Sequence, residues 1–154
     1  MSLMRRTLIV LSLLLVPVVF SGCLSEELSI TMRVLNGAPY VPGGTMDIEV
    51  SFDYAGTETV YAIGINQIFP ADWTFNSYPL QSGSNAIPSL MSESNEPIEF
   101  GYVGIPPLPA TFVYTVNIPE NASGDIEIQG YSLFRFDGDL VLSPVTTLTV
   151  QQAI

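Results

Sequence analysis

Apolar and polar residues alternate along much of this 154-residue chain. The clearest alternation runs over residues 47–54, DIEVSFDY, and residues 28–34, LSITMRV, follow the same rule. Because successive side chains of a strand point to opposite faces, a spacing of two predicts strands that bury one face. Further strands are predicted at residues 59–68, 73–78, 98–104, 111–118, 125–136 and 139–150.

Clusters of proline, glycine and asparagine separate these segments, as is typical of turns between short strands. The chain holds 12 Pro and 12 Gly, and no segment after residue 22 keeps apolar residues at helical spacing. About eight strands at this spacing predict an all-β fold, a single immunoglobulin-like Greek-key β-sandwich. Residues 79–97, rich in Ser, Asn and Pro, are predicted to lack a strand, and we expect a mobile or functional loop there.

The N-terminal residues follow a different pattern. Arg5 and Arg6 precede an uncharged, mostly apolar run over residues 7–20, which small residues follow. This order is typical of a secretory signal peptide, and the run is shorter than the roughly 20 residues that span a bilayer. We predict three parts, which are a signal helix at residues 1–22 that is removed, a short tether at 23–27, and the β-sandwich domain at 28–154.

The end of this segment, Phe20-Ser21-Gly22-Cys23, resembles the lipobox of bacterial lipoproteins, with Phe20 in place of the usual leucine. The resemblance implies cleavage between Gly22 and Cys23 and fatty acyl chains, such as palmitate, attached to the new N-terminal cysteine. The signal peptide would direct export, so the protein would be extracytoplasmic, either periplasmic or surface-exposed. Because two or more acyl chains hold a protein stably at a bilayer, it would be anchored to the cell membrane or outer membrane. A secreted protein without lipid and an uncleaved anchor are the alternatives.

Charge and missing residue types exclude several classes of function. The chain carries 15 Asp and Glu, four Arg, and neither Lys nor His. Its net charge of −11 becomes −13 once the two leader arginines leave, because two Arg then stand against 15 acidic residues. Such a field repels phosphate backbones, so no nucleic-acid partner is expected. Without His or Lys there is no Ser-His or Cys-His pair and no Schiff base, so we predict no enzyme and no cofactor.

Asp137 and Asp139 are candidate calcium ligands, because closely spaced carboxylates supply hard oxygen atoms. A hairpin is the favoured interpretation, since Phe136 and Leu140 flank a glycine-containing turn between two apolar segments. No glutamate follows at the spacing that an EF-hand requires. We therefore predict a turn here and no metal site.

Asp47, Glu49 and Asp53 share one face of a predicted strand. Neighbours on such a face lie about 6.5 to 7 Å apart, a separation that a pair of glycosidase carboxylates can use. A solvated strand face is the favoured interpretation, because charges on strands protect against edge-to-edge aggregation.

Tyr61, Trp73 and Tyr78 are candidate ligand-facing aromatic residues, because flat rings stack on sugars. For Trp73, packing in the core is favoured, since so large a ring is usually mostly buried. A carbohydrate-binding module would need these rings exposed together on one face.

From residue 40 onward, a series of strand-and-turn motifs follows in a fixed order: YVPG at 40–43, DYAGT at 53–57, FPADWTF at 69–75, PLPATFVYTV at 107–116 and PENASGD at 119–125. This order resembles the immunoglobulin-like repeat domains of bacterial and archaeal secreted and surface proteins. Asp72 stands where that family usually has glycine. The resemblance implies a structural or adhesive module and transfers no catalytic residue.

The leading prediction is a lipid-anchored, extracytoplasmic, non-catalytic structural or protein-interaction module of the adhesion type. Its expected contacts are the membrane, through the N-terminal lipid, and a protein or polysaccharide partner. A carbohydrate-binding module is the alternative, and a carboxylate-based glycoside hydrolase is the third hypothesis.

Overall fold

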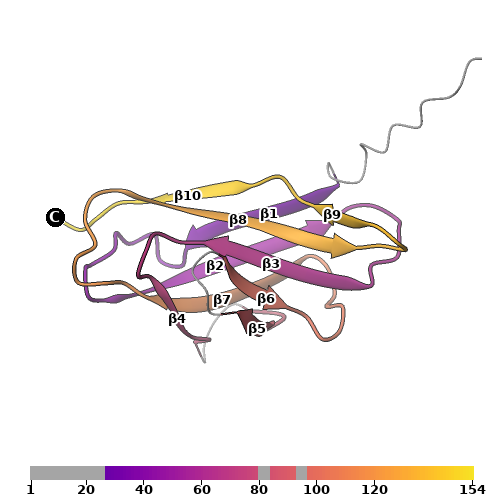
Figure 1. Ribbon diagram of the computed structural model, residues 1–154, viewed down its shortest axis with the longest axis horizontal. Helices are drawn as coiled ribbons and strands as arrows, with labels where there is room; N and C mark the ends of the chain where they lie inside the picture. The colour runs from indigo at the N-terminus through magenta and orange to yellow at the C-terminus, as the bar shows by residue number, and fades with distance from the viewer. Residues whose placement is uncertain (1–26, 80–83, 93–96) are drawn as a thin grey trace, which may run out of the picture.

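The computed structural model describes residues 27–79, 84–92 and 97–154. The predicted signal peptide and Cys23 lie outside this part. Within it the chain forms ten β-strands in two facing sheets (Figure 1). The strands are β1 (Leu28–Val34), β2 (Thr45–Tyr54), β3 (Ala62–Ile68), β4 (Thr74–Ser77), β5 (Ser89–Ser92), β6 (Ile98–Gly101), β7 (Ala110–Asn117), β8 (Ile126–Arg135), β9 (Leu140–Leu142) and β10 (Thr146–Val150). Among the described residues, no helix has the length and apolar character needed to cross a membrane.

The first sheet has the strand order β1-β2-β7-β4, and the second has the order β10-β8-β3-β6-β5, with β9 also paired to β8. Strands that follow each other in sequence, such as β2 and β3, often lie in different sheets. All strand pairs between these elements are antiparallel. The predicted all-β sandwich is confirmed, with ten strands in place of about eight.

Two differences from the prediction account for the additional strands. Residues 139–150 form two strands, because Pro144 has no N–H group with which to continue the ladder to β8. Residues 79–97 contain β5, so the prediction that this segment lacks a strand is wrong. This short edge strand has consecutive apolar residues, Leu90 and Met91, at a register shift, and therefore shows no alternation in the sequence.

The core fills the space between the sheets. Ile48, Val50 and Phe52 of β2 point into it from alternate positions, as the pattern predicts. Trp73 closes one part of the core, with its ring centroid 5.6 Å from that of Tyr40. The preceding residue, Asp72, has a φ of 68°. This left-handed conformation favours glycine, and aspartate is among the few other residue types that adopt it.

Candidate interaction surface

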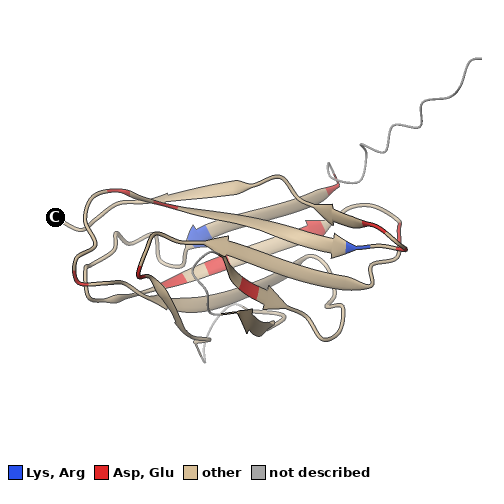
Figure 2. Ribbon diagram, in the orientation of Figure 1, with Lys and Arg blue, Asp and Glu red and all other residues tan. Residues whose placement is uncertain are grey.

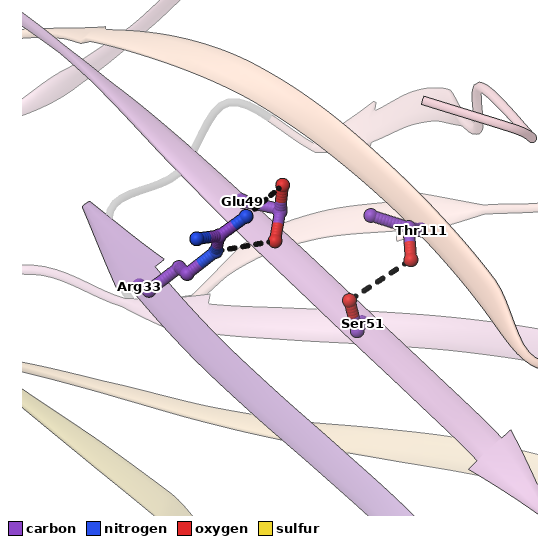
Figure 3. Close-up of polar contacts among 4 residues, drawn as sticks. All are labelled: Arg33, Glu49, Ser51 and Thr111. Carbon is purple, nitrogen blue, oxygen red and sulfur yellow. Dashed lines mark hydrogen bonds and ion pairs between the residues drawn. The ribbon is translucent and has the colours of Figure 1, made fainter. Parts of the chain in front are cut away.

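The outer face of the first sheet is polar, and its side chains pair with one another (Figure 3). Arg33 of β1 donates from Nε and Nη2 to the two carboxylate oxygens of Glu49 of β2, at 2.6 and 3.0 Å. The hydrogen bond with Glu49, and the charge of its carboxylate, raise the pKa of Arg33. Beside this pair, the hydroxyl oxygens of Ser51 and Thr111 lie 2.9 Å apart.

The other two acidic residues of β2 also have partners on this face. The Thr115 hydroxyl donates to Asp47 at 2.6 Å, and a carboxylate oxygen of Asp53 accepts the backbone N–H of Tyr54 at 2.8 Å. The shared face predicted for Asp47, Glu49 and Asp53 is confirmed. Because each carboxylate is engaged by a different group, this arrangement gives no support to the hydrolase hypothesis.

Asp137 and Asp139 lie in the turn between β8 and β9. The N–H of Phe136 donates to the carbonyl of Asp139 at 2.8 Å, and Gly138 has a φ of 86°. The predicted hairpin is confirmed by the pairing of the two strands that it joins. In the part of the chain that the structure describes, no three Asp, Glu, Cys or His side chains gather as metal ligands would.

The three candidate aromatic residues do not form one platform. Trp73 is 1% exposed, so the ligand-facing interpretation is wrong for this residue and the core interpretation is confirmed. Tyr78 is half-buried, and its ring lies 5.2 Å from that of Phe75 and 6.3 Å from that of Phe100. Tyr61 is 60% exposed and donates its backbone N–H to Arg135.

The Tyr78 hydroxyl is buried without a hydrogen-bond partner in the described structure, and burial raises the pKa of Tyr78 to about 12. Tyr78→Phe removes this group and leaves no partner behind, so the free energy of unfolding is expected to rise by about 1 kcal/mol at pH 7. The raised pKa means that native stability is lost as pH rises from 10.0 toward about 12, and Tyr78→Phe reduces that loss. Urea unfolding across this pH range measures both effects.

Tyr102→Phe is the matched control. The hydroxyl of Tyr102 donates to the carbonyl of Ala86 at 3.3 Å, so its removal leaves an acceptor without this donor. Stability at pH 7 should therefore fall in the control and rise in Tyr78→Phe. A loss of stability in both variants would contradict the assignment of an unsatisfied hydroxyl to Tyr78.

In contrast to the first sheet, the second sheet has an apolar centre on its outer face. One row across it joins Leu142 of β9, Leu133 of β8, Gly64 of β3 and Gly101 of β6 by direct pairing. Met91 of β5 lies next to Gly101 in this row. We call these five residues the apolar strip. Figure 2 shows β3, at the middle of this sheet, without a charged residue along its length.

The two glycines of the strip lie on adjacent strands, and each is in contact with a neighbouring apolar side chain. A Cβ atom at Gly64 would lie 3.4 Å from Leu133 Cδ1, and one at Gly101 would lie 3.0 Å from Met91 Cγ. The side chains of Leu133 and Met91 therefore lie against the two glycines, which remain partly exposed. Glycine within a strand often marks a place where another backbone or a ligand approaches closely.

Polar residues border the apolar strip. On one side, Asn66 Nδ2 donates to the hydroxyl of Tyr131 at 2.9 Å, and Glu99 is paired with Asn66 across β3 and β6. On the other side, Arg135 pairs with Ala62 and with Leu140, which is 54% exposed, so apolar surface continues beside this charge. An apolar centre whose rim contains polar and charged residues is typical of a protein–protein interface.

The apolar strip was not predicted from the sequence. Met91 is 68% exposed and Leu142 is 49% exposed, and these two side chains lie at opposite ends of the strip. The alternation of Ile63, Gly64 and Ile65 does indicate that Gly64 points outward. Its neighbours on the other strands come from distant parts of the chain, and no local pattern identifies them.

Comparison with known proteins shows which solved structures have a similar fold. No protein-family model matches this sequence, and no curated protein sequence matches it. Among solved structures, a cohesin module of a family 33 glycoside hydrolase from Clostridium perfringens superposes with a TM-score of 0.61. The superposition covers 82% of this chain and 96% of that chain, at 12% identity. This chain has a cohesin-like fold.

Two further structures are similar over most of this chain. The N-terminal domain of a Streptococcus gordonii adhesin has a TM-score of 0.48 and 9% identity, over 84% of this chain and 33% of that chain. A conjugative transposon lipoprotein from Bacteroides eggerthii has a TM-score of 0.47 and 10% identity, over 82% of this chain and 98% of that chain. At 12% identity, the similarity to the cohesin module shows the fold of this chain and nothing more.

Proposed function

We propose that this chain is a lipid-anchored, extracytoplasmic, non-catalytic module that binds a protein partner through the apolar strip. The apolar strip is the observation that carries the proposal, because it places exposed apolar side chains and two partly exposed glycines in one row across a sheet. The first sheet shows no comparable surface within the described residues, since its outer face is polar and engaged in cross-strand pairs.

The energy available at the apolar strip supports a specific but modest contact. Full burial of a leucine or methionine side chain contributes about 1.5 to 3 kcal/mol, and a side chain that is already half covered contributes roughly half of that. The side chains of Leu142 and Met91 are 49% and 68% exposed, so each would contribute roughly half or more of the free energy of full burial. Interface energy is usually concentrated in a few residues.

A protein is favoured over a polysaccharide because the candidate rings are dispersed. Trp73 is in the core, Tyr78 is half-buried, and only Tyr61 is strongly exposed among the three. Sugar binding normally uses flat aromatic faces. The net charge of −13 after removal of the leader, two Arg against 15 acidic residues, further favours a basic partner, which is attracted over long range.

The lipid anchor and the extracytoplasmic location rest on the sequence around Cys23. The lipobox-like FSGC segment follows a charged start and a short apolar run. An anchored module would present its apolar strip to partners near the membrane surface.

Site-specific photocrosslinking tests the proposed interface. The full chain is expressed in the organism from which it comes, with a benzophenone amino acid in place of Leu133. After irradiation, this probe is expected to yield a discrete adduct with one protein. The same probe at Ser51, on the polar face of the first sheet, is the matched control and should yield none. Equal adducts from both positions, or none from Leu133, would contradict the proposal.

The captured partner then allows a quantitative measurement. Leu133→Asp is expected to weaken its binding by about 10- to 100-fold, because the interface would bury an unpaired carboxylate. Ser51→Asp should leave the affinity unchanged. Binding to insoluble polysaccharides that survives Leu133→Asp would favour the carbohydrate-binding alternative.

A further inference from the structure

The loop at residues 102–109 joins β6 of the second sheet to β7 of the first. Its sequence, YVGIPPLP, has no charged residue, in a chain with 15 acidic residues. The side chain of Val103 is 97% exposed, and that of Ile105 is 41% exposed. Residues 103–107, which we call the loop tip, therefore present uncharged, apolar surface to solvent.

Both ends of this loop are fixed to the sandwich. Tyr102 and Leu108 are partly buried and pack against the core. The N–H of Tyr102 donates to the carbonyl of Ile63 at 3.2 Å, and the side-chain Nδ2 of Asn85 donates to the carbonyl of Pro109 at 3.1 Å. Because its two ends are held in this way, the loop tip has a defined position relative to the sheets.

The composition of the loop tip suits the interface between water and lipid. Pro106 and Pro107 have no N–H group, so the tip carries fewer donors that would lose their water on leaving solvent. Tyr61 lies at the same end of the sandwich, two residues before Ile63, and is 60% exposed. Tyrosine, with an apolar ring and a polar hydroxyl, is common at membrane interfaces.

The loop tip lies at the end of the sandwich where β1 begins (Figure 1). Leu28, the first residue of β1, pairs with Tyr54 of β2, and Phe52 of β2 pairs with Ala110, the first residue of β7. The loop ends directly before Ala110. Since neighbouring strands lie about 4.8 Å apart, the base of the loop is only about 10 Å to the side of β1.

The proposed lipid is attached close to this end. Cys23 precedes Glu27, the first described residue, by four residues, which span at most about 14 Å. Acyl chains on Cys23 would therefore hold this end of the sandwich within about 14 Å of the bilayer. The loops at the other end lie about 33 Å away along the ten residues of β2 and are held much less closely.

We propose that the loop tip is a second membrane contact, which places Val103 and Ile105 in the lipid interface when Cys23 is acylated. This inference rests on the proposed function, because it requires the lipid anchor. Two apolar side chains are too few to hold a free protein on a bilayer, but the anchor makes their contact intramolecular and raises its effective concentration. The domain would then stand on this end, with the apolar strip turned sideways toward partners along the membrane.

The charges around the loop tip determine which lipids favour this contact. Glu58, Asp137 and Asp139 are exposed at the same end, beside Arg135 (Figure 2). These carboxylates repel anionic headgroups, so the contact depends on apolar insertion and not on charge attraction. We expect the loop tip to enter neutral bilayers more deeply than anionic ones.

A spin label at Gly104 tests the proposal. A Cβ atom at Gly104 would meet no heavy atom within 4 Å apart from its chain neighbours, and Gly104→Cys keeps both Val103 and Ile105. The full acylated chain, in which the new thiol is the free one, is labelled and reconstituted in phosphatidylcholine vesicles. Ser123→Cys, exposed in the loop between β7 and β8 at the other end, is the matched control. Collisions with a water-soluble nickel chelate, measured by electron paramagnetic resonance, should be about fivefold less frequent at Gly104 than at Ser123.

Two further arms use the same label. Val103→Asp is expected to restore the collisions at Gly104 to the level of the control, because a carboxylate does not enter the lipid interface, whereas Val103→Leu should keep the protection. Val103 is almost fully exposed, so neither change disturbs the core. In vesicles with phosphatidylglycerol the protection at Gly104 should be about twofold smaller, and a larger protection would overturn the charge assignment.

The outcomes separate this inference from the function on which it rests. The intact mass of the protein from its own membranes reports the acyl chains on Cys23, and their absence would contradict both the anchor and the second contact. An acylated protein whose label at Gly104 meets the chelate as often as the label at Ser123 would overturn the second contact alone. Protection at Gly104 that survives Val103→Asp would also overturn it.

Discussion

Replacing Trp73 with alanine is expected to lower the free energy of unfolding by about 3 to 5 kcal/mol, the usual cost of deleting a large buried ring. The side chain is 1% exposed and contacts the rings of Tyr40 and Phe69, with centroids at 5.6 and 6.2 Å. Its removal leaves a cavity that close-packed neighbours fill only in part. Domains of this size are stable by about 5 to 15 kcal/mol, so this loss is a large part of the total stability.

Trp73→Phe is the matched control, because it keeps an aromatic ring against Tyr40 and Phe69. Its loss of stability should be roughly half that of Trp73→Ala or less. Trp73 is the only tryptophan, so unfolding in urea has to be followed by far-ultraviolet circular dichroism rather than by its fluorescence. Equal stability of the wild type and Trp73→Ala would show that the ring does not pack in the core.

Replacing Cys23 with alanine is expected to move the protein from the membrane fraction to the soluble fraction. The proposed acyl chains are attached at this residue, and each buried methylene contributes about 0.8 kcal/mol to membrane binding. Their loss should be complete, because Cys23 is the only cysteine in the chain. Fractionation after labelling with a clickable palmitate analogue measures both the modification and the location.

Ser25→Ala, two residues after Cys23, is the control for Cys23→Ala and should remain acylated and membrane-bound. The chain carries 15 acidic residues against four Arg, so charge attraction to anionic lipids does not offer another means of attachment. A Cys23→Ala protein that stays in the membrane fraction would overturn the lipid anchor. It would leave the interface at the apolar strip to be judged by crosslinking from Leu133.

Strands with one buried face were predictable because their signal is local. The alternation over residues 47–54 and 28–34 identified β2 and β1 closely, and the turn at residues 136–140 identified the β8–β9 hairpin. The strand β5 could not be found this way. It is short, lies at the edge of a sheet and has consecutive apolar residues, so neither period nor burial marks it in the sequence.

The sequence by itself determined the sandwich class, the acidic character, the lack of His and Lys, and the predicted anchor at Cys23. Each of these follows from composition or from neighbours along the chain. Only the tertiary structure decided that Gly64, Gly101 and Leu133 lie in one row, because strand register joins residues up to 69 positions apart. The approach of β1 to β10 likewise joins strands from opposite ends of the described chain, and no local pattern encodes that distance.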